Sequence, residues 1–139
     1  MSMMQKLGVP LVLVLLAGAS VALADDVPPI HKATPAGQAV KLRNHVKLTS
    51  TCAGSEPTIS FSQKPAHGTV DVRPDRFTFG EGYVSGALKA CEGRQVDGIA
   101  IWYTPAAGFH GVDQISWTAD FGGSKNRRVD NYSAQVTVQ

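Results

Sequence analysis

Histidine is the residue type in this 139-residue chain best suited to metal or acid–base chemistry. The four histidines are His31, His45, His67 and His110. No two of them have the spacing that places two imidazoles on one face of a strand, so a transition-metal site would depend on tertiary proximity. We expect surface or turn histidines. His67 and His110 lie in two turn motifs that one end of a fold could bring together, which leaves a shared site open.

The two cysteines, Cys52 and Cys91, match no common metal or redox pattern. They are 39 positions apart, with no CxxC spacing and no adjacent histidine. An even cysteine count in a chain that is exported, as argued below, indicates a disulfide. Closing a loop of this size stabilises a fold by about 4 kcal/mol in the chain-entropy treatment. We therefore predict a Cys52–Cys91 disulfide.

Serines and carboxylates form no recognisable catalytic arrangement. No nucleophile elbow surrounds any serine, and no spacing among the acids selects a pair for glycoside cleavage. We predict no catalytic residue, no enzyme activity and no cofactor. Asp113 and Asp120 are weak calcium candidates, because neither lies in a DxDxDG-like loop. For Asp113 we favour a structural role, in which its carboxylate accepts backbone N–H groups of the preceding turn.

Two aromatic side chains, Tyr83 and Trp102, could contact a ligand. Trp102 has the strand parity opposite to that of Ile101 and Tyr103, so it is either buried under a long loop, which we favour, or exposed. An exposed Trp102 would form a carbohydrate- or protein-contact patch with Tyr83. Candidate binding residues are therefore Tyr83, Trp102, His67 and His110.

The N-terminus has the organisation of a secretory signal. Lys6 precedes the apolar run LGVPLVLVLLAGASVA, and Ala22, Leu23 and Ala24 form the small-x-small pattern of a cleavage site. The run is too short for a retained anchor. We predict a cleaved signal peptide over residues 1–24, a periplasmic or secreted product, and no stable membrane insertion after cleavage.

The remaining 115 residues have the size of one domain. The signal contains Lys6 and no acid, so its removal lowers the formal charge from +2 to +1, with charges scattered along the chain. This distribution argues against nucleic-acid binding.

Alternation of apolar and polar residues indicates an all-β fold. Residues 25–37 contain three prolines and predict an extended lead-in rather than a core element. Within 38–139, period-two alternation recurs between turn residues, and the Gly-rich stretch 80–97 predicts a long loop held by Cys91. The alternating sets include Val40 with Leu42, Val46 with Leu48, Ile99 with Ile101, Ile115 with Trp117, and Tyr132 with Ala134, Val136 and Val138. Seven to eight strands in this length favour an antiparallel sandwich.

Three motifs between residues 65 and 122 resemble bacterial Ig-like, cadherin-like domains, whose repeats carry P-x-x-G-T-V, then Y-T-P-x-x-x-F-x-G-x-D and an aromatic strand ending in D-x-x-G. The similarity covers residues 57–138. It lies in Pro65, Gly68, Thr69, Val70, Tyr103, Thr104, Pro105, Phe109, Gly111, Asp113, Trp117, Asp120 and Gly122. The resemblance implies an Ig-like sandwich. About thirty residues, including Cys91, replace the short connection usual between the first two motifs, and the domain stands alone behind its signal.

A solitary domain needs its function on its own surface, most plausibly on loop 80–97. We therefore expect an exported, non-enzymatic accessory of the cell envelope that binds a protein or polysaccharide, as a monomer or with weak self-association. Two alternatives remain open. One is a small periplasmic enzyme or metal-dependent factor using His67 and His110, and the other is a protein inhibitor presenting loop 80–97.

Overall fold

The computed structural model describes residues 27–125 and 127–139. The predicted signal peptide and residues 25–26 of the lead-in lie outside this part of the chain. Across the described residues, no helix is both long enough and apolar enough to cross a membrane.

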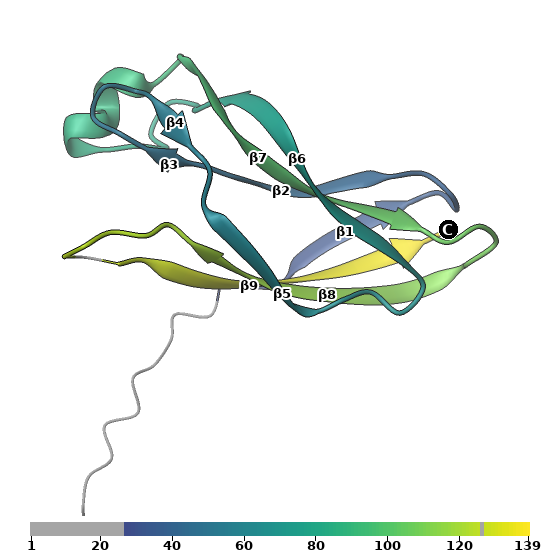
Figure 1. Cartoon of the computed structure of the whole chain (residues 1–139). Helices are drawn as coiled ribbons and strands as arrows, with labels where there is room; N and C mark the ends of the chain where they lie inside the picture. The colour runs from purple at the N-terminus through teal and green to yellow at the C-terminus, as the bar shows by residue number, and fades with distance from the viewer. Residues whose placement is uncertain (1–26, 126) are drawn as a thin grey trace, which may run out of the picture.

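The described residues form nine strands and one short 3-10 helix (Figure 1). The strands are β1 (Ile30–Thr34), β2 (Val40–His45), β3 (Lys47–Leu48), β4 (Gly54–Ser55), β5 (Thr58–Gln63), β6 (Gly68–Thr78), β7 (Gln95–Pro105), β8 (Gly111–Asp120) and β9 (Val129–Val138), and the helix is η1 (Gly86–Cys91). The predicted all-β fold is confirmed.

Two main sheets face each other, with strand orders β1-β9-β8-β5 and β2-β7-β6, and β3 pairs with β4 in a small hairpin. Their facing sides enclose one core. Its buried members are Leu42, Ile101, Tyr103, Ile115, Trp117, Ala119, Tyr132, Ala134, Val136 and Val138. The predicted alternation of β7, β8 and β9 therefore identifies the inner face correctly. Trp117 is only 1% exposed, and burying a large apolar side chain contributes about 1.5–3 kcal/mol.

The lead-in differs from its prediction, because residues 30–34 form β1. This strand pairs with β9 in parallel, with Ile30 opposite Ala134 and Thr34 opposite Val138, so the sheet is not purely antiparallel. The prolines explain the error. Pro28 and Pro29 precede the strand and Pro35 follows it, and proline is tolerated at strand ends where no ladder donor is needed.

Strand β2 contains a bulge that changes which side chains face the core. The register passes from Lys41 opposite Trp102 to Arg43 opposite Ile101, so Leu42 is the extra residue. Beyond the bulge, His45 lies opposite the buried Ile99. Simple alternation from Val40 and Leu42 predicts Asn44 on the inner face, whereas the bulge places Arg43 and His45 there.

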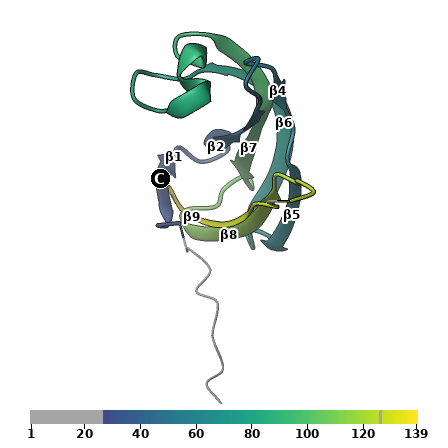
Figure 2. The ribbon, with the colours of Figure 1, turned by 90° about the vertical axis from the view of Figure 1, so that its left-hand side faces the viewer.

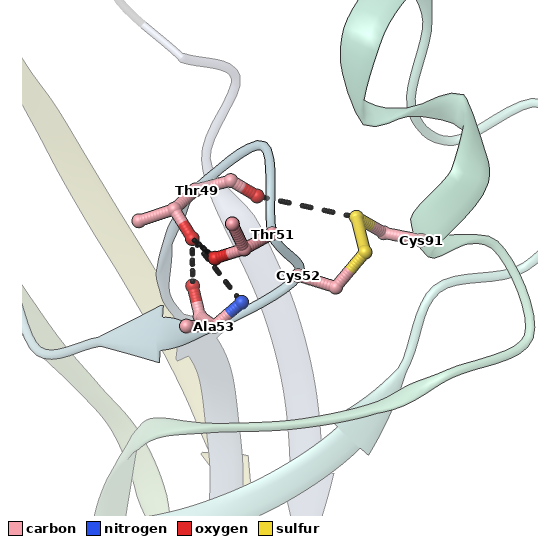
Figure 3. Close-up of a disulfide and its surroundings, with 5 residues drawn as sticks. All are labelled: Thr49, Thr51, Cys52, Ala53 and Cys91. Carbon is pink, nitrogen blue, oxygen red and sulfur yellow. Dashed lines mark hydrogen bonds between the residues drawn. A yellow bond between two sulfur atoms is a disulfide. The ribbon is translucent and has the colours of Figure 1, made fainter.

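A disulfide joins Cys52 and Cys91, as predicted. It ties the turn between β3 and β4 to the last residue of η1 (Figure 3). The Thr49 side chain closes the same turn, since its Oγ1 donates to the Ala53 carbonyl oxygen at 3.1 Å and accepts from the Ala53 amide at 3.2 Å. β7 begins at Gln95, so the long connection spans 79–94 rather than 80–97 and includes η1.

Close backbone packing anchors the β3–β4 hairpin on β7. A Cβ at Gly54 would lie 1.9 Å from the Asp97 carbonyl oxygen, so only glycine fits this approach. Together, the hairpin, residues 79–94 and the β8–β9 turn (residues 121–125 and 127–128) make up what we call the disulfide end. The opposite end, formed by turns 35–39, 64–67 and 106–110, is called the turn end (Figure 1).

Candidate functional site

At the disulfide end, the two sheets diverge and leave an open cleft of about 950 Å³. Figure 2 views the molecule from this end, with η1 and the β8–β9 pair on opposite sides of the opening. Basic and aromatic side chains line it. The basic ones are Arg43, Lys47 and Arg128, and the aromatic ones are Phe77, Phe79, Tyr83, Phe121 and Tyr132. No aspartate or glutamate of the described chain lines the cleft.

His45 lies at the base of the cleft and is only 3% exposed. Trp117 donates its indole N–H to His45 Nε2 at 2.9 Å, and the Tyr132 ring lies 4.7 Å from the imidazole. Burial, together with the positive charge of Arg43, lowers the pKa of His45 from 6.5 to about 4, against a smaller opposing effect of Asp130. The imidazole is therefore neutral near pH 7.

The hydrogen bond from Trp117 also decides the tautomer of His45. Because Nε2 accepts, the single proton of the neutral ring resides on Nδ1, which becomes a donor. Nδ1 makes no hydrogen bond to a described residue. Every fully buried side-chain nitrogen or oxygen of the described chain does have a partner, so an atom without one retains some solvent access. Nδ1 is therefore not completely enclosed, and His45 is one of the residues that line the cleft.

Arg43 stacks on the neighbouring Tyr132, with its guanidinium carbon 4.8 Å from the ring centre. Within the described chain it forms no ion pair. Arg128, by contrast, pairs with Asp130 at 2.6 Å, and the Tyr132 hydroxyl donates to the same carboxylate at 3.0 Å. Burial alone would raise the pKa of Asp130, but these bonds bring it below its ordinary value. Of these two arginines, Arg43 keeps the uncompensated charge.

Tyr83, a predicted binding residue, lines the cleft and is 80% exposed. Its ring lies 6.4 Å from that of Phe79, which is itself 5.1 Å from Phe77. These three rings form an aromatic wall contributed by the end of β6 and the long connection. Residues 79–94, expected to carry function, therefore supply one side of the cleft.

Trp102 lies elsewhere, on the outer face of the β2-β7-β6 sheet. Its ring is covered by Lys41 and Arg73, whose charged groups lie 5.5 and 5.1 Å from the ring centre. It is partly buried and does not line the cleft. The structure thus does not join Trp102 and Tyr83 in one patch, and the cover over Trp102 comes from neighbouring strands.

His67 and His110 lie in two turns at the turn end, far along the strands from the cleft. The His67 carbonyl oxygen accepts from the Ala106 amide at 2.8 Å, and its ring lies 4.3 Å from that of Phe109, so the two turns are in contact. Both histidines are exposed. Over the described ranges, no group of three or more His, Cys, Asp or Glu side chains could hold a metal ion.

Asp113 is buried at the turn end, and its carboxylate accepts four hydrogen bonds. The donors are the amides of Ala66 and His67, each at 2.9 Å, the Tyr103 hydroxyl at 3.0 Å and the Gln114 amide at 3.1 Å. Burial would raise the pKa of Asp113, yet these bonds lower it overall. The carboxylate therefore fastens the β5–β6 turn, not the turn that precedes β8.

Asp120, the other calcium candidate, lies at the disulfide end. It accepts the Gly122 amide at 2.8 Å and forms an ion pair with Arg127. Chiefly the hydrogen bond from Arg127 lowers the pKa of Asp120. Asp113 and Asp120 are at opposite ends of β8, so they cannot share one ion.

Sequence reasoning missed Arg43 and was wrong about His45, which it expected on the surface or in a turn and which is buried at the end of β2. One signal was present, since Asn44 is polar at a position that alternation assigns to the core. Such a break in phase is typical of a bulge, which shifts the following side chains to the other face.

The arguments for this cleft come from its own geometry and chemistry. No family model, curated protein or solved structure matches the chain.

Proposed function

We propose that this chain is an exported, non-enzymatic Ig-like domain that binds a glycan of the cell envelope in the cleft at its disulfide end. The observation that carries the proposal is the lining of that cleft. An exposed tyrosine and partly buried phenylalanine rings lie beside hydrogen-bond donors in a space of about 950 Å³, large enough for several sugar rings.

The order of the strands supports the Ig-like part of the proposal. In a constant-type immunoglobulin domain, one sheet contains strands B, E and D, and the other contains C, F and G. The sheets β2-β7-β6 and β5-β8-β9 follow that order, and β1 adds to the edge of β9. The disulfide departs from the immunoglobulin pattern, because it joins two loops at one end rather than the two sheets.

The nature of the cleft favours a glycan among envelope ligands. Pyranose rings present apolar C–H faces and a periphery of hydroxyls, so they suit aromatic surfaces flanked by polar groups. Tyr83 and Phe79 offer the aromatic surface. Tyrosine is also among the residues that contribute most at binding surfaces.

A preformed frame further supports binding. The disulfide fixes η1 relative to the β3–β4 turn, so the wall that contains Tyr83 is anchored at its far side. Less conformational entropy is then lost when a ligand is bound. Disulfides also form and persist in oxidising compartments outside the cytoplasm, in agreement with the proposed export.

The proposal is tested by titrating the oxidised, isotope-labelled protein with a panel of neutral and acidic oligosaccharides and following its amide NMR signals. We expect shifts concentrated in residues 43–48, 77–88 and 121–128. Tyr83→Ala should weaken binding at least fivefold, by loss of ring contact. His110→Ala, an exposed change at the turn end, is the matched control and should leave binding unchanged.

Absence of shifts with every oligosaccharide at millimolar concentration would overturn the glycan proposal. Shifts confined to turns 64–67 and 106–110 would move the site to the other end and support the His67 and His110 alternative. Binding of a protein partner with no response to glycans would replace the ligand class while keeping the cleft.

A further inference from the structure

The charged side chains that line the cleft are all basic. Arg43, Lys47 and Arg128 line it without an acidic residue among the described lining side chains. Asp130 neutralises Arg128, whereas neither Arg43 nor Lys47 forms an ion pair with a described residue. A cleft with low-dielectric aromatic walls strengthens the field of such charges. An anionic group would therefore be attracted to Arg43 in particular.

Arg43 is held in place before any ligand arrives. Its guanidinium lies on Tyr132, which in turn stacks on Trp117 with ring centres 5.7 Å apart and donates its hydroxyl to Asp130. A guanidinium that stacks by its face keeps its N–H edge available, and that edge matches a carboxylate or sulfate with two parallel hydrogen bonds.

His45 adds a second donor beside Arg43. The two residues are two positions apart on the inner face of β2, and the imidazole lies 4.7 Å and the guanidinium 4.8 Å from the same Tyr132 ring. His45 lines the cleft, its Nδ1 is not completely enclosed, and no described residue accepts from the Nδ1–H. Both side chains therefore contact the same ring and line the same cleft.

We infer that the cleft recognises acidic sugars, and that the carboxylate or sulfate of one residue of the glycan binds the Arg43 guanidinium and the His45 Nδ1–H. This inference rests on the proposed function and specifies its ligand. The adjoining sugar rings lie along the wall formed by Phe77, Phe79 and Tyr83. Lys47, a compact charge in β3 of the hairpin, attracts the next acidic group along the glycan chain.

The matched ligands are tri-galacturonate and its neutral counterpart galactotriose, which differ in the oxidation of C6. We expect the oxidised protein without its signal peptide to bind the acidic trisaccharide at least tenfold more tightly than the neutral one at low salt. One charge-assisted hydrogen-bonded pair predicts a difference of this size. The preference should shrink as salt rises, because exposed charges are screened. Galactose 6-sulfate, tested against galacturonate and galactose, distinguishes a sulfate from a carboxylate.

Arg43→Met removes the charge but keeps an apolar stem on Tyr132. It should abolish the preference for the acidic ligand and leave the neutral affinity unchanged. Arg73→Met is the matched control, since Arg73 also stacks on an aromatic ring, that of Trp102, but on the outer face of the same sheet. Arg43→Lys keeps a point charge without the bidentate edge and should retain part of the preference. If Arg43→Met does not fold, Arg43→Lys is the variant used for this test.

The bound state should also alter His45. An oxyanion on Nδ1–H shifts the His45 ring signals in NMR spectra, while the Trp117 indole signal stays in place because its bond to Nε2 is kept. Equal affinity for the acidic and neutral trisaccharides would overturn the inference while the proposed function stands. An equal loss in Arg73→Met would also overturn it. Failure of both ligands to bind would overturn the proposed function itself.

Discussion

The two ends of this molecule differ in how far the hydrogen-bonding groups of their polar side chains are paired. At the turn end, the Asp113 carboxylate receives four donors from three elements. At the disulfide end, Arg43 and His45 face a cleft with donor groups that no described residue accepts. The first arrangement closes the fold, and the second leaves hydrogen-bonding capacity for a ligand. In this molecule, the carboxylate whose hydrogen bonds are complete holds the fold together, and the side chains with unused donors line the cleft.

The means of stabilisation differ as well. The turn end is held by noncovalent bonds to one buried carboxylate, whereas the disulfide end, opened by its cleft, is held by a covalent link between two loops. A cleft removes packing contacts from its walls, and the disulfide offsets that loss.

Removing the disulfide should produce the largest effect on this comparison. Replacing both cysteines by alanine should lower the free energy of unfolding by about 4 kcal/mol, because a loop of about 40 residues is no longer closed in the unfolded chain. Urea unfolding followed by tryptophan fluorescence measures the loss. In hydrogen exchange, the extra opening should appear in residues 79–94 and not in turn 64–67. Uniform loosening of both ends would contradict the assignment of the disulfide to local support.

Asp113→Ala should be the next largest change and should act at the turn end alone. It leaves the Ala66 and His67 amides and the buried Tyr103 hydroxyl without their acceptor, which should cost about 3 kcal/mol. Asp120→Ala is the control, because it breaks a surface pair with Arg127 and should cost less than about 1 kcal/mol. Both are measured by urea unfolding. Altered glycan affinity in a folded Asp113→Ala protein would break the separation between the ends.

The stability of the disulfide end should depend on pH because of His45. The folded pKa of about 4 lies below the ordinary 6.5, so the unfolded chain binds a proton that the folded protein excludes. The contribution of His45 to the free energy of unfolding is therefore fully present above pH 6.5. It is lost as the pH is lowered from 6.5 toward 4, by at most about 3 kcal/mol. The groups that face the imidazole are Trp117, Tyr132, Phe121, Arg43 and, at longer range, Asp130.

His45→Gln supplies the control for this pH dependence. Glutamine has an amide oxygen that can accept from Trp117, but it does not titrate. The variant should therefore lose the dependence between pH 6.5 and 4.5, as measured by urea unfolding at a series of pH values. Asp113 and Asp130, whose pKa values are lowered, contribute their own losses below the ordinary aspartate range. An unchanged slope in His45→Gln would show that another group governs stability in this window.

Much of the fold was predictable because it depends on local pattern. The alternation in β7, β8 and β9 identified their buried faces, and two cysteines in a chain allow one intramolecular pairing. Tyr83, a candidate chosen from the sequence, lines the cleft, whereas the sheets hold Trp102, His67 and His110 away from it.

The amino-acid sequence by itself determined the strand-forming segments, their inner faces away from the bulge, and the disulfide, since each follows from side-chain period or residue count. Only the tertiary structure decided the parallel pairing of β1 with β9, the bulge at Leu42 and the divergence of the sheets at the disulfide end. These features depend on contacts between residues far apart in the chain. Arg43 and His45 became a candidate site because one extra residue in β2 turned both toward Tyr132.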